Sequence, residues 1–317
     1  MDYQECKLYG ISNKKYLSEL LHIEAFKLKD IDRYFSTDFY ISKNRNKARH
    51  IYPPKPNYKK ILKRLNWYLS RIHVPDFVNG GVKNKSYVMN GLGHINSKHF
   101  LLLDIKNFYP STSDFFVNRF FKNRLNMSTD IAKICTLLVT EPHPLNDNYR
   151  HLPQGYPTSS LLSFLVYSDM YIHLYNYAMQ NNITFTCFVD DLTFSSDDYI
   201  SKSFKRNINK IVRRYNLEIN SGKTMHRRIN KGINITGTYI KENKLFAPNR
   251  LQKDMSIAFS ELCAAYEANP KDINRLNLLC NQLQGYIVNV KLIEEAKSLD
   301  YMQNMITKVR RFIRNKV

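Results

Sequence analysis

The stretch TFTCFVDDLTFS, residues 184–195, decides how the rest of the chain is organised. β-Branched and aromatic residues lie on both sides of Asp190 and Asp191, which is typical of two short strands joined by a tight turn. Two neighbouring carboxylates at the tip of a half-buried hairpin repel each other unless a cation lies between them. Hard oxygen ligands of this kind suit Mg2+. Taken alone, the stretch also fits an ordinary Asp-Asp surface turn. The rest of the chain must decide between this turn and a metal site.

A third carboxylate follows an apolar run upstream. Residues 100–105 read FLLLDI, which is typical of a central strand buried on both faces. Asp104 at the exit of such a strand is costly to bury without a metal or a base as partner. A helix predicted over residues 161–179 separates it from the Asp190-Asp191 pair. The order strand-Asp, helix, strand-Asp-Asp-strand can place all three carboxylates on one face of a sheet, which outlines a two-metal phosphoryl-transfer site.

The composition describes a folded and strongly basic protein. Of 317 residues, 43% are hydrophobic and 13% aromatic, which is enough to bury a sizeable core. Lys and Arg number 48 against 27 Asp and Glu, and the net charge of +21 is spread from Lys7 to Lys316. Such a field favours a long polyanion, with nucleic acid as the first candidate. The 22 Tyr and 18 Phe offer surfaces on which bases could stack.

Several classes are disfavoured. The five cysteines show no C-x-x-C spacing, so we expect neither a zinc site nor a disulfide framework, and we infer a reducing, cytoplasmic compartment. The N-terminal residues lack an apolar signal segment. The most apolar long run, residues 161–178, is interrupted by Asp169, His173 and Asn176 and does not read as a membrane span.

The rest of the chain alternates helical patterns with basic or glycine-rich turns. Residues 39–54 contain two short β-like runs around a basic turn, which suits either a phosphate clamp or a solvated loop. Four glycines within residues 77–94 permit close backbone approach, or merely loop flexibility. Residues 202–215 predict a basic amphipathic helix. From Pro248 onward the pattern is helical, over residues 250–268, 272–288 and 291–316.

Four motifs occur in a characteristic order along about residues 45–250. They are Asp104–Ser111 (DIKNFYPS), Leu152–Ser160 (LPQGYPTSS), Phe188–Asp191 (FVDD) and Asn220–Thr224 (NSGKT). In turn they resemble the first catalytic motif, the Leu-Pro-Gln-Gly box with its Pro-Ser-Ser continuation, the aromatic-x-Asp-Asp box and the catalytic-lysine motif of reverse transcriptases. Chance agreement of all four is improbable, so the chain resembles an RNA-directed DNA polymerase.

Two further elements make the chain similar to bacterial retron reverse transcriptases. Residues 90–94, Asn-Gly-Leu-Gly-His, resemble the retron Asn-Ala-x-x-His element with Gly91 in place of Ala. Residues 235–237, Ile-Thr-Gly, resemble its Val-Thr-Gly element. An intron-encoded or abortive-infection reverse transcriptase is the alternative enzyme. A non-catalytic RNA-binding scaffold on a polymerase fold is a second alternative, against which the intact carboxylates and Gln154 argue.

The resemblance implies an α+β right-hand polymerase. N-terminal helices and fingers would occupy residues 1–95, and a palm with an antiparallel sheet backed by helices would occupy residues 96–247. A fingers insertion would lie at about residues 111–150, and a helical thumb at residues 248–317. We expect no residues to remain after the thumb for a ribonuclease H or endonuclease domain.

The resemblance also implies the catalytic groups. Asp104 and Asp190 would bridge two Mg2+ ions about 3.5 to 4 Å apart. The Ile105 carbonyl would be a backbone metal ligand, and Asp191 would assist. Lys223 is the candidate general acid for pyrophosphate.

Three residues would line the site of the incoming dNTP. Tyr109 resembles the bulky residue that closes against a ribose 2′-hydroxyl and so selects deoxynucleotides, although a plain core aromatic is the alternative. Gln154 would contact the nucleotide. Val189, where many relatives carry Ala, would lie beside the primer end.

The basic turn acquires a role by the same resemblance. Arg49 resembles the fingers residue that contacts the triphosphate. Arg45 and Lys47 compete with it for this role.

The two retron elements are linked by resemblance to recognition of the cognate noncoding RNA, and their candidate residues are Asn90, His94, Thr236 and Gly237. Hydrogen bonds that merely pin a loop are the alternative. Arg310 and Arg311 belong to a basic C-terminal stripe that would grip duplex backbone, with a solvated helix face as the competing interpretation.

The family also implies partners. The enzyme would use dNTPs to copy a structured noncoding RNA into branched multicopy single-stranded DNA (msDNA), primed from a guanosine 2′-hydroxyl. Host ribonuclease H would remove RNA. A retron effector protein would join the complex, with a role in antiphage defence.

Overall fold

The computed structural model describes residues 1–317 apart from 45–46, 144–145, 231, 269, 271 and 317. The chain forms two compact units, each built from two separate segments. Unit 1 contains Met1–Ser86 and Lys98–Arg227, and unit 2 contains Tyr87–Ser97 and Arg228–Val317. The predicted assignment of residues to fingers, palm and thumb is a functional division and stays a prediction.

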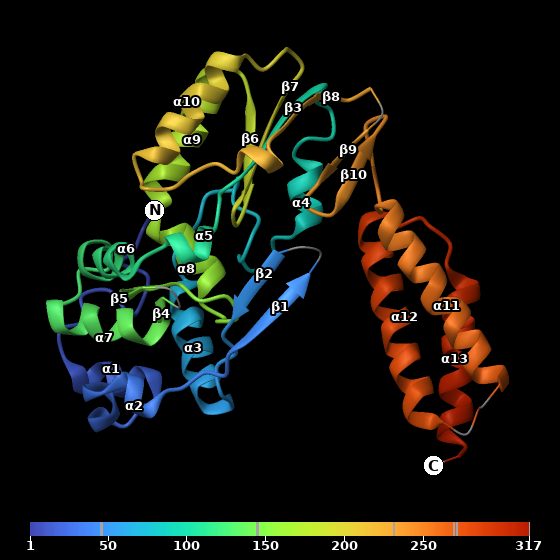
Figure 1. Ribbon diagram of the computed structural model, residues 1–317, viewed down its shortest axis with the longest axis horizontal. Helices are drawn as coiled ribbons and strands as arrows, with labels where there is room; N and C mark the ends of the chain where they lie inside the picture. The colour runs from blue at the N-terminus through green and yellow to red at the C-terminus, as the bar shows by residue number, and fades with distance from the viewer. Residues whose placement is uncertain (45–46, 144–145, 231, 269, 271, 317) are drawn as a thin grey trace. The chain divides into compact units, whose positions relative to one another are not determined.

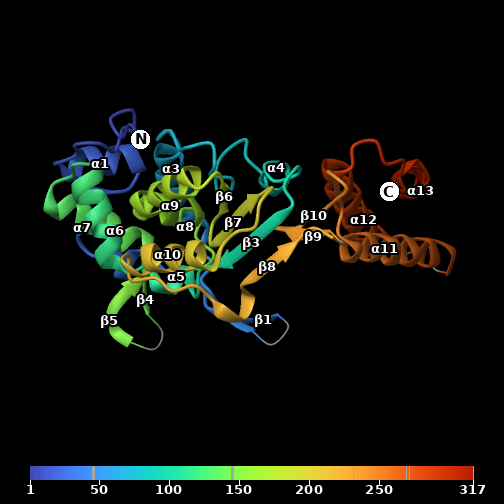
Figure 2. The ribbon, with the colours of Figure 1, turned by 90° about the horizontal axis from the view of Figure 1, so that it is seen from above.

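A four-stranded sheet forms the centre of unit 1 (Figures 1 and 2), with the strand order β6-β7-β3-β8. Its strands are β6 (Thr184–Phe188), β7 (Asp191–Ser196), β3 (His99–Asp104) and β8 (Met225–Arg228). β7 pairs antiparallel with both β6 and β3. The hairpin predicted around the Asp-Asp pair is present, and the predicted strand ending at Asp104 lies between β7 and β8.

Helices cover this sheet, because α9 (Ser168–Gln180) packs against β6 and α10 (Lys202–Arg213) packs against α9. The buried side chains of α10 recur at helical spacing: Phe204, Ile208, Ile211 and Val212. The ring of Phe204 contacts the edge of Phe194 in β7, at 5.5 Å between centroids. The amphipathic helix predicted here therefore uses its apolar face to back the sheet.

The single helix predicted over residues 161–179 is wrong, since the structure has α8 (Ser159–Val166) and α9 separated at Tyr167. Tyr167 has φ −106° and ψ 22°, outside helical geometry. Its buried ring packs against Phe108 and Phe116. We attribute the break to this burial between two aromatic rings from distant segments, which helical periodicity does not reveal.

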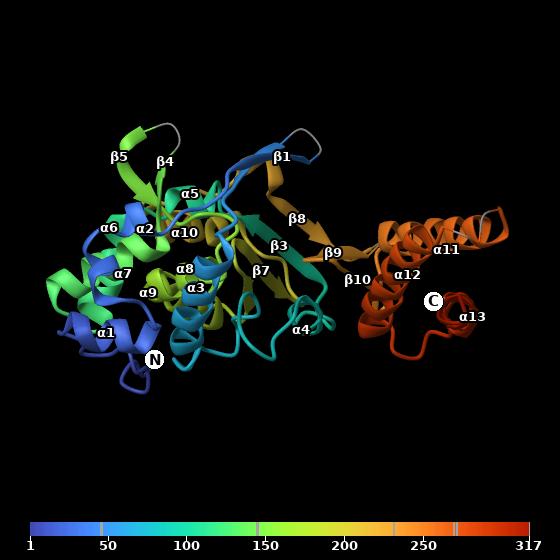
Figure 3. The ribbon, with the colours of Figure 1, turned by 90° about the horizontal axis from the view of Figure 1, so that it is seen from below.

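The remaining elements of unit 1 are short helices and two antiparallel hairpins, β1–β2 and β4–β5 (Figure 3). The N-terminal elements are α1 (Lys14–Leu21), η1 (Ala25–Lys29), α2 (Ile31–Tyr34), β1 (Tyr40–Asn44), β2 (Lys47–Ile51) and α3 (Pro56–Leu69). Those that follow β3 are α5 (Phe108–Ser111), α6 (Asp114–Arg119), the π-helical turn η2 (Phe120–Arg124), α7 (Thr129–Val139), β4 (Glu141–His143), β5 (Asn146–His151) and η3 (Ser221–Lys223).

Unit 2 joins one helix from the first half of the chain to the C-terminal elements. Helix α4 (Tyr87–Leu92) packs against a three-stranded antiparallel sheet of order β11-β10-β9. The other elements are β9 (Ile233–Ile235), β10 (Thr238–Lys241), β11 (Lys244–Phe246), α11 (Asn249–Ala268), α12 (Ile273–Ile293) and α13 (Asp300–Arg314). The last three helices pack on one another around a separate core that includes Leu262, Leu283 and Ile306.

The predicted start of the last helix at residue 291 is wrong, because α12 continues to Ile293 and α13 begins at Asp300. Glu294 follows α12, and its carboxylate accepts a hydrogen bond of 2.8 Å from the Ala247 amide. It also pairs with Lys297. This tertiary contact favours a turn where the sequence pattern alone allows a helix.

Across the described residues, we find no helix with the length and apolarity that a membrane crossing requires.

Candidate active site

The three predicted carboxylates meet at one end of the central sheet. The register of β3 and β7 places Asp104 opposite Asp191. The Ile105 amide donates a hydrogen bond of 3.0 Å to the Asp190 carbonyl. Residues from two distant segments thus lie side by side, as the order of strands and helix predicted.

The turn that carries Asp190 is held in a strained conformation. Val189 has φ 59°, a left-handed value that is uncommon for a β-branched residue. Its carbonyl accepts a hydrogen bond of 2.8 Å from the buried Tyr171 hydroxyl. A Cβ atom added to Gly80 would lie 2.5 Å from the Val189 nitrogen. The glycine-rich segment therefore supports the acidic turn by close backbone approach, the first of its two predicted uses.

The site concentrates negative charge that the protein only partly neutralises. Burial first, and then the other two carboxylates, raise the pKa of Asp191 to about 7. The pKa of Asp190 is also raised, chiefly by burial and by Asp104, while Lys223 and Arg49 oppose the shift. The Lys223 ammonium forms an ion pair with Asp104, whose other oxygen accepts a 3.3 Å hydrogen bond from the Asn220 amide.

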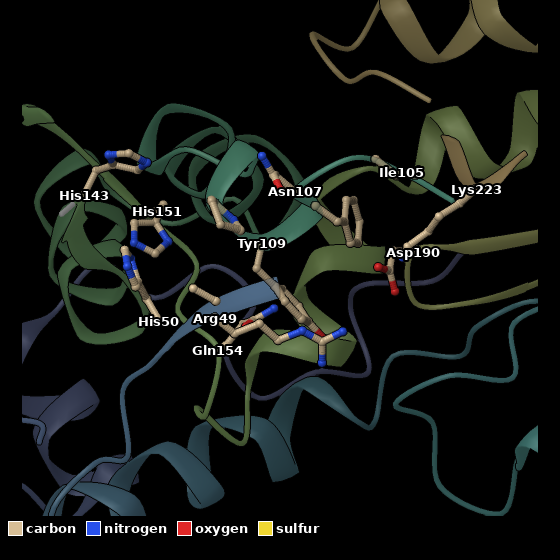
Figure 4. Close-up of a pocket in the computed structure, with 13 residues that line it drawn as sticks. Arg49, His50, Ile105, Asn107, Tyr109, His143, His151, Gln154, Asp190 and Lys223 are labelled. Carbon is tan, nitrogen blue, oxygen red and sulfur yellow. The ribbon is translucent and has the colours of Figure 1, made fainter. Parts of the chain in front are cut away.

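A cavity of about 240 Å³ opens beside Asp190 (Figure 4), while Asp104 and Asp191 are not among its lining residues. Five of the predicted residues line it, Arg49, Tyr109, Gln154, Asp190 and Lys223, together with the Ile105 backbone position. Val189 belongs to the adjoining turn and is not among the lining residues. Of the cations that competed with Arg49, Arg45 lies outside the described residues, as does the side chain of Lys47.

The Leu-Pro-Gln-Gly segment is fixed against the basic hairpin. The Tyr52 amide donates a 2.8 Å hydrogen bond to the Gln154 carbonyl. Gly155 has φ 115°, and a Cβ atom there would lie 2.8 Å from the Tyr52 carbonyl oxygen. Tyr109 is tied to the same region because its hydroxyl lies 3.0 Å from the Ser160 hydroxyl. The β1–β2 hairpin, Gln154 and Tyr109 thus form one connected wall of the cavity.

Within unit 2 the two predicted RNA elements contact each other. The Asn90 amide donates a 2.9 Å hydrogen bond to the Thr236 hydroxyl. Gly237 adopts φ 96°, and Thr236 φ 42°. His94 is 1% exposed, and burial lowers its pKa to about 3. These contacts agree with the interpretation that the elements pin a loop, and their contact with RNA stays a prediction.

The basic stripe lies on α13. Arg310 donates a 3.2 Å hydrogen bond to the Asn281 side chain, and Arg311 is exposed.

A model of the family "Reverse transcriptase (RNA-dependent DNA polymerase)" matches residues 41–240. The chain belongs to the reverse transcriptase family. Retron Se72 reverse transcriptase of Salmonella heidelberg is 30% identical over 298 residues, which cover 90% of this chain and 76% of that protein. Retron Mx65 reverse transcriptase of Myxococcus xanthus is 27% identical over 70% of this chain and 54% of its own length. Retron Ec86 reverse transcriptase of Escherichia coli is 28% identical over 63% of this chain and 60% of its own length.

This reverse transcriptase is accordingly a retron-type RNA-directed DNA polymerase, as its motifs predicted.

Among solved structures, apo telomerase from Candida tropicalis has a TM-score of 0.48 and 11% identity, covering 68% of this chain and 55% of the telomerase chain. Telomerase from Candida albicans, solved with a fragment of telomeric RNA, has a TM-score of 0.47 and 11% identity. The matched region covers 89% of this chain and 60% of that telomerase chain.

Sequence reasoning missed several residues of the site in this reverse transcriptase. His50, His143, His151 and Asn107 also line the cavity. Tyr171 supports the acidic turn by a hydrogen bond to the Val189 carbonyl. Asn220 donates a hydrogen bond to the Asp104 carboxylate. Asn220 could have been found, since it lies in the quoted NSGKT motif. The histidines come from three separate segments, and no spacing in the sequence connects them.

Proposed function

We propose that this reverse transcriptase copies a cognate structured noncoding RNA into branched msDNA, primed from a guanosine 2′-hydroxyl. Catalysis would be phosphoryl transfer at Asp104, Asp190 and Asp191. The observation that carries the proposal is the meeting of these three carboxylates at one end of the sheet, with Asp190 lining the cavity. The pKa values of Asp190 and Asp191 are raised by burial and by the neighbouring carboxylates.

The donor set fits divalent cations. Carboxylate and carbonyl oxygens are the hard ligands that Mg2+ prefers. Burial and the neighbouring carboxylates disfavour the charged forms of Asp190 and Asp191, and a bound cation would relieve this. Asp104, Asp190, Asp191 and the Ile105 carbonyl would hold two Mg2+ ions. When bound, these ions supply activation of the attacking hydroxyl and neutralisation of the leaving pyrophosphate. No group of three or more His, Cys, Asp or Glu side chains in the described ranges is already arranged as a metal cluster.

Lys223 has a double role in this proposal. Its ammonium pairs with Asp104 in the free enzyme and so offsets part of the buried negative charge. Release of this pair would free Asp104 for a cation. It would also leave Lys223 available to donate its proton to the departing pyrophosphate, as a general acid.

The cavity wall would bind the incoming nucleotide. Arg49 would contact the triphosphate, and it is already close enough to Asp190 to oppose the rise of that residue's pKa. Tyr109 would pack against C2′ of the sugar, because its hydrogen bond with Ser160 fixes the ring. Gln154 would contact the nucleotide from the segment fixed against the β1–β2 hairpin, and Val189 would border the primer end.

The remaining parts of the proposal follow from retron membership. Asn90, His94, Thr236 and Gly237 would recognise the noncoding RNA, and Arg310 and Arg311 would contact its backbone. The fingers, palm and thumb would follow the predicted ranges, and the complex would act in the cytoplasm. An effector protein, host ribonuclease H and a role in antiphage defence complete the proposal.

Single carboxylate substitutions test the catalytic part. Asp104→Asn and Asp190→Asn should each abolish primer extension on an RNA template while RNA affinity stays within about twofold, since neither carboxylate supplies positive charge to the phosphate backbone. Asp198→Asn, on an exposed residue beyond β7, is the matched control. Normal extension by either active-site variant would contradict the assignment.

Sequencing nucleic acid that copurifies with the protein tests the product, because branched RNA-linked DNA distinguishes a retron from other reverse transcriptases.

A further inference from the structure

A hollow of about 240 Å³ lies on the surface of unit 1, where the end of α6 and the π-helical turn η2 meet the start of α9. It shares no lining residue with the active-site cavity. The sequence of η2 divides between core and surface, because Phe120 and Phe121 are buried while residues 122–124, Lys-Asn-Arg, are exposed. Turns of this kind are rare and occur frequently at functional sites. The proposed function gives this hollow no task.

Positive charge exceeds negative charge at the hollow. Arg119 and Arg124 line it together with Asp169, which pairs with Arg124. Burial and then Asp169 raise the pKa of the Tyr215 phenol, whereas the charges of Arg214, Arg124 and Arg119 oppose the rise. Three guanidinium groups from two distant segments therefore lie near one hydroxyl. In the part of the chain that the structure describes, Arg119 and Arg214 form no ion pair with a carboxylate, so their charge is available to an anion.

A second hollow, of about 600 Å³, adjoins the first, because Arg119 and Asn123 line both. It lies between α6 and α7 and adds the cations Lys122 and Lys133, while Asp114 is the acid among its lining residues. We call the two hollows together the α6–η2 groove. Because cations follow the groove from one hollow to the other, it suits a ligand with several phosphates.

The second hollow also offers an exposed ring and a hydrogen-bond acceptor. Phe115 lines it and is 65% exposed, and bases stack on exposed aromatic rings of this kind. The Asn118 amide nitrogen donates a 3.4 Å hydrogen bond to the Thr136 hydroxyl, which leaves the amide oxygen to accept. A ribose 2′-hydroxyl can donate to this oxygen, and DNA lacks that group.

We propose that the α6–η2 groove binds a single-stranded segment of the cognate noncoding RNA outside the active site. Arg119 and Lys133 pair with phosphates in the two hollows. Phe115 stacks on a base, which only a single strand presents freely, and the Asn118 oxygen accepts from a 2′-hydroxyl. This inference deepens the proposed function and rests on it, since that function supplies the RNA.

Fluorescence anisotropy with a labelled 12-nucleotide oligouridylate tests the groove, without dNTP and with a saturating unlabelled template–primer duplex in the active site. At about 0.1 M salt each phosphate contact with a single strand contributes about fivefold in affinity. Arg119→Ala/Lys133→Ala should therefore bind the RNA about 25-fold more weakly, and the slope of log affinity against log salt should fall by about 1.4.

Lys29→Ala/Arg33→Ala is the matched control, since it removes the same two charges from exposed residues that line neither hollow. Its affinity should stay within about twofold of the unmodified enzyme. Unchanged affinity in the groove variant would overturn the inference. An equal loss in the control would also overturn it, because the effect would then be one of net charge.

Cross-linking on the unmodified enzyme covers the case in which the groove variant does not fold. A 12-mer that carries 4-thiouridine should cross-link to Phe115 or Tyr215, as mapped by mass spectrometry, and cross-links confined to other segments would contradict the inference. The DNA 12-mer of the same sequence should bind about fivefold more weakly, the size of one neutral hydrogen bond, and equal affinity would contradict the choice of RNA. Primer extension by the unmodified enzyme tests the proposed function separately.

Discussion

Adding one methyl group at Gly80 should disable the acidic turn without altering any residue that contacts substrate. In Gly80→Ala the new Cβ would lie 2.5 Å from the Val189 nitrogen, 2.8 Å from Val189 Cγ2 and 2.9 Å from the Phe188 carbonyl carbon. Relaxed contacts between such atoms need about 3.5 Å, so the two backbones must separate by roughly 1 Å. Neither side yields easily, because Phe77 and Asn79 form backbone hydrogen bonds of 2.9 Å with Cys187.

The expected cost has two parts. Overpacking of this kind destabilises a protein by about 1–3 kcal/mol. A displacement of roughly 1 Å at a catalytic group lowers the rate about 100-fold, and Asp190 follows Val189 directly. We therefore expect Gly80→Ala to lower kcat by about two orders of magnitude, with a modest loss of stability.

Single-turnover extension of an RNA-templated primer at saturating dNTP measures the rate, and urea unfolding measures the stability. Gly285→Ala is the matched control, since a Cβ there meets no atom within 4 Å and Gly285 lies inside α12. Alanine is favoured over glycine in a helix by about 1 kcal/mol, so the control should be slightly stabilised and fully active. A Gly80→Ala enzyme with normal kcat would refute the idea that this contact positions Asp190.

Further outcomes concern three single residues and one exchanged segment. Tyr109→Ala should admit ribonucleotides, raising the efficiency ratio of rNTP to dNTP; unchanged sugar selection would contradict the role of the ring. Lys223→Arg keeps a cation beside Asp104 but is a poor proton donor, so kcat should fall about 100-fold with little change in dNTP KM. The pKa of buried His94 is lowered to about 3, from an ordinary value of 6.5. The unfolded state therefore binds the proton more readily, and stability should fall as pH drops from about 6.5 toward 3, by up to about 1.4 kcal/mol per unit. Urea unfolding at pH 7.5 and 5 should show this slope, and His94→Gln should have a shallower one, because the lowered pKa of His151 contributes in the same direction. Exchange of residues 230–317 with those of a related retron enzyme should switch template choice, measured by copying of the two noncoding RNAs.

The sequence predicts the carboxylate site well because local patterns determine it. The apolar run that ends in Asp104 pairs with the run that begins at Asp191, and the register places these two carboxylates opposite each other. Helix ends were predicted less well. The breaks at Tyr167 and Glu294 arise from contacts with distant residues, namely buried aromatic rings for the first and the Ala247 amide for the second.

The rest of the site depends on tertiary contacts that no single segment contains. Gly80 reads as loop flexibility until Val189 is seen against it. The three histidines share a cavity because two hairpins converge there. Gly91, which replaces the alanine of the retron element, has a similar explanation, since a Cβ atom there would collide with the Thr238 hydroxyl. The reason for glycine at position 91 is visible only in the structure, where Thr238 lies against it.

Helix α4 belongs to a compact unit whose other members are synthesised much later. Tyr87–Ser97 is separated from Arg228–Val317 by about 130 residues, which a ribosome adds in roughly 6 to 26 seconds at about 5–20 residues per second. During that interval Val88, which is buried in the core of unit 2, has no partner to pack against. Folding of unit 2 should therefore wait until the C-terminal segment has been synthesised. Expression of residues 1–227 alone would leave Val88 without the core of unit 2 to pack against.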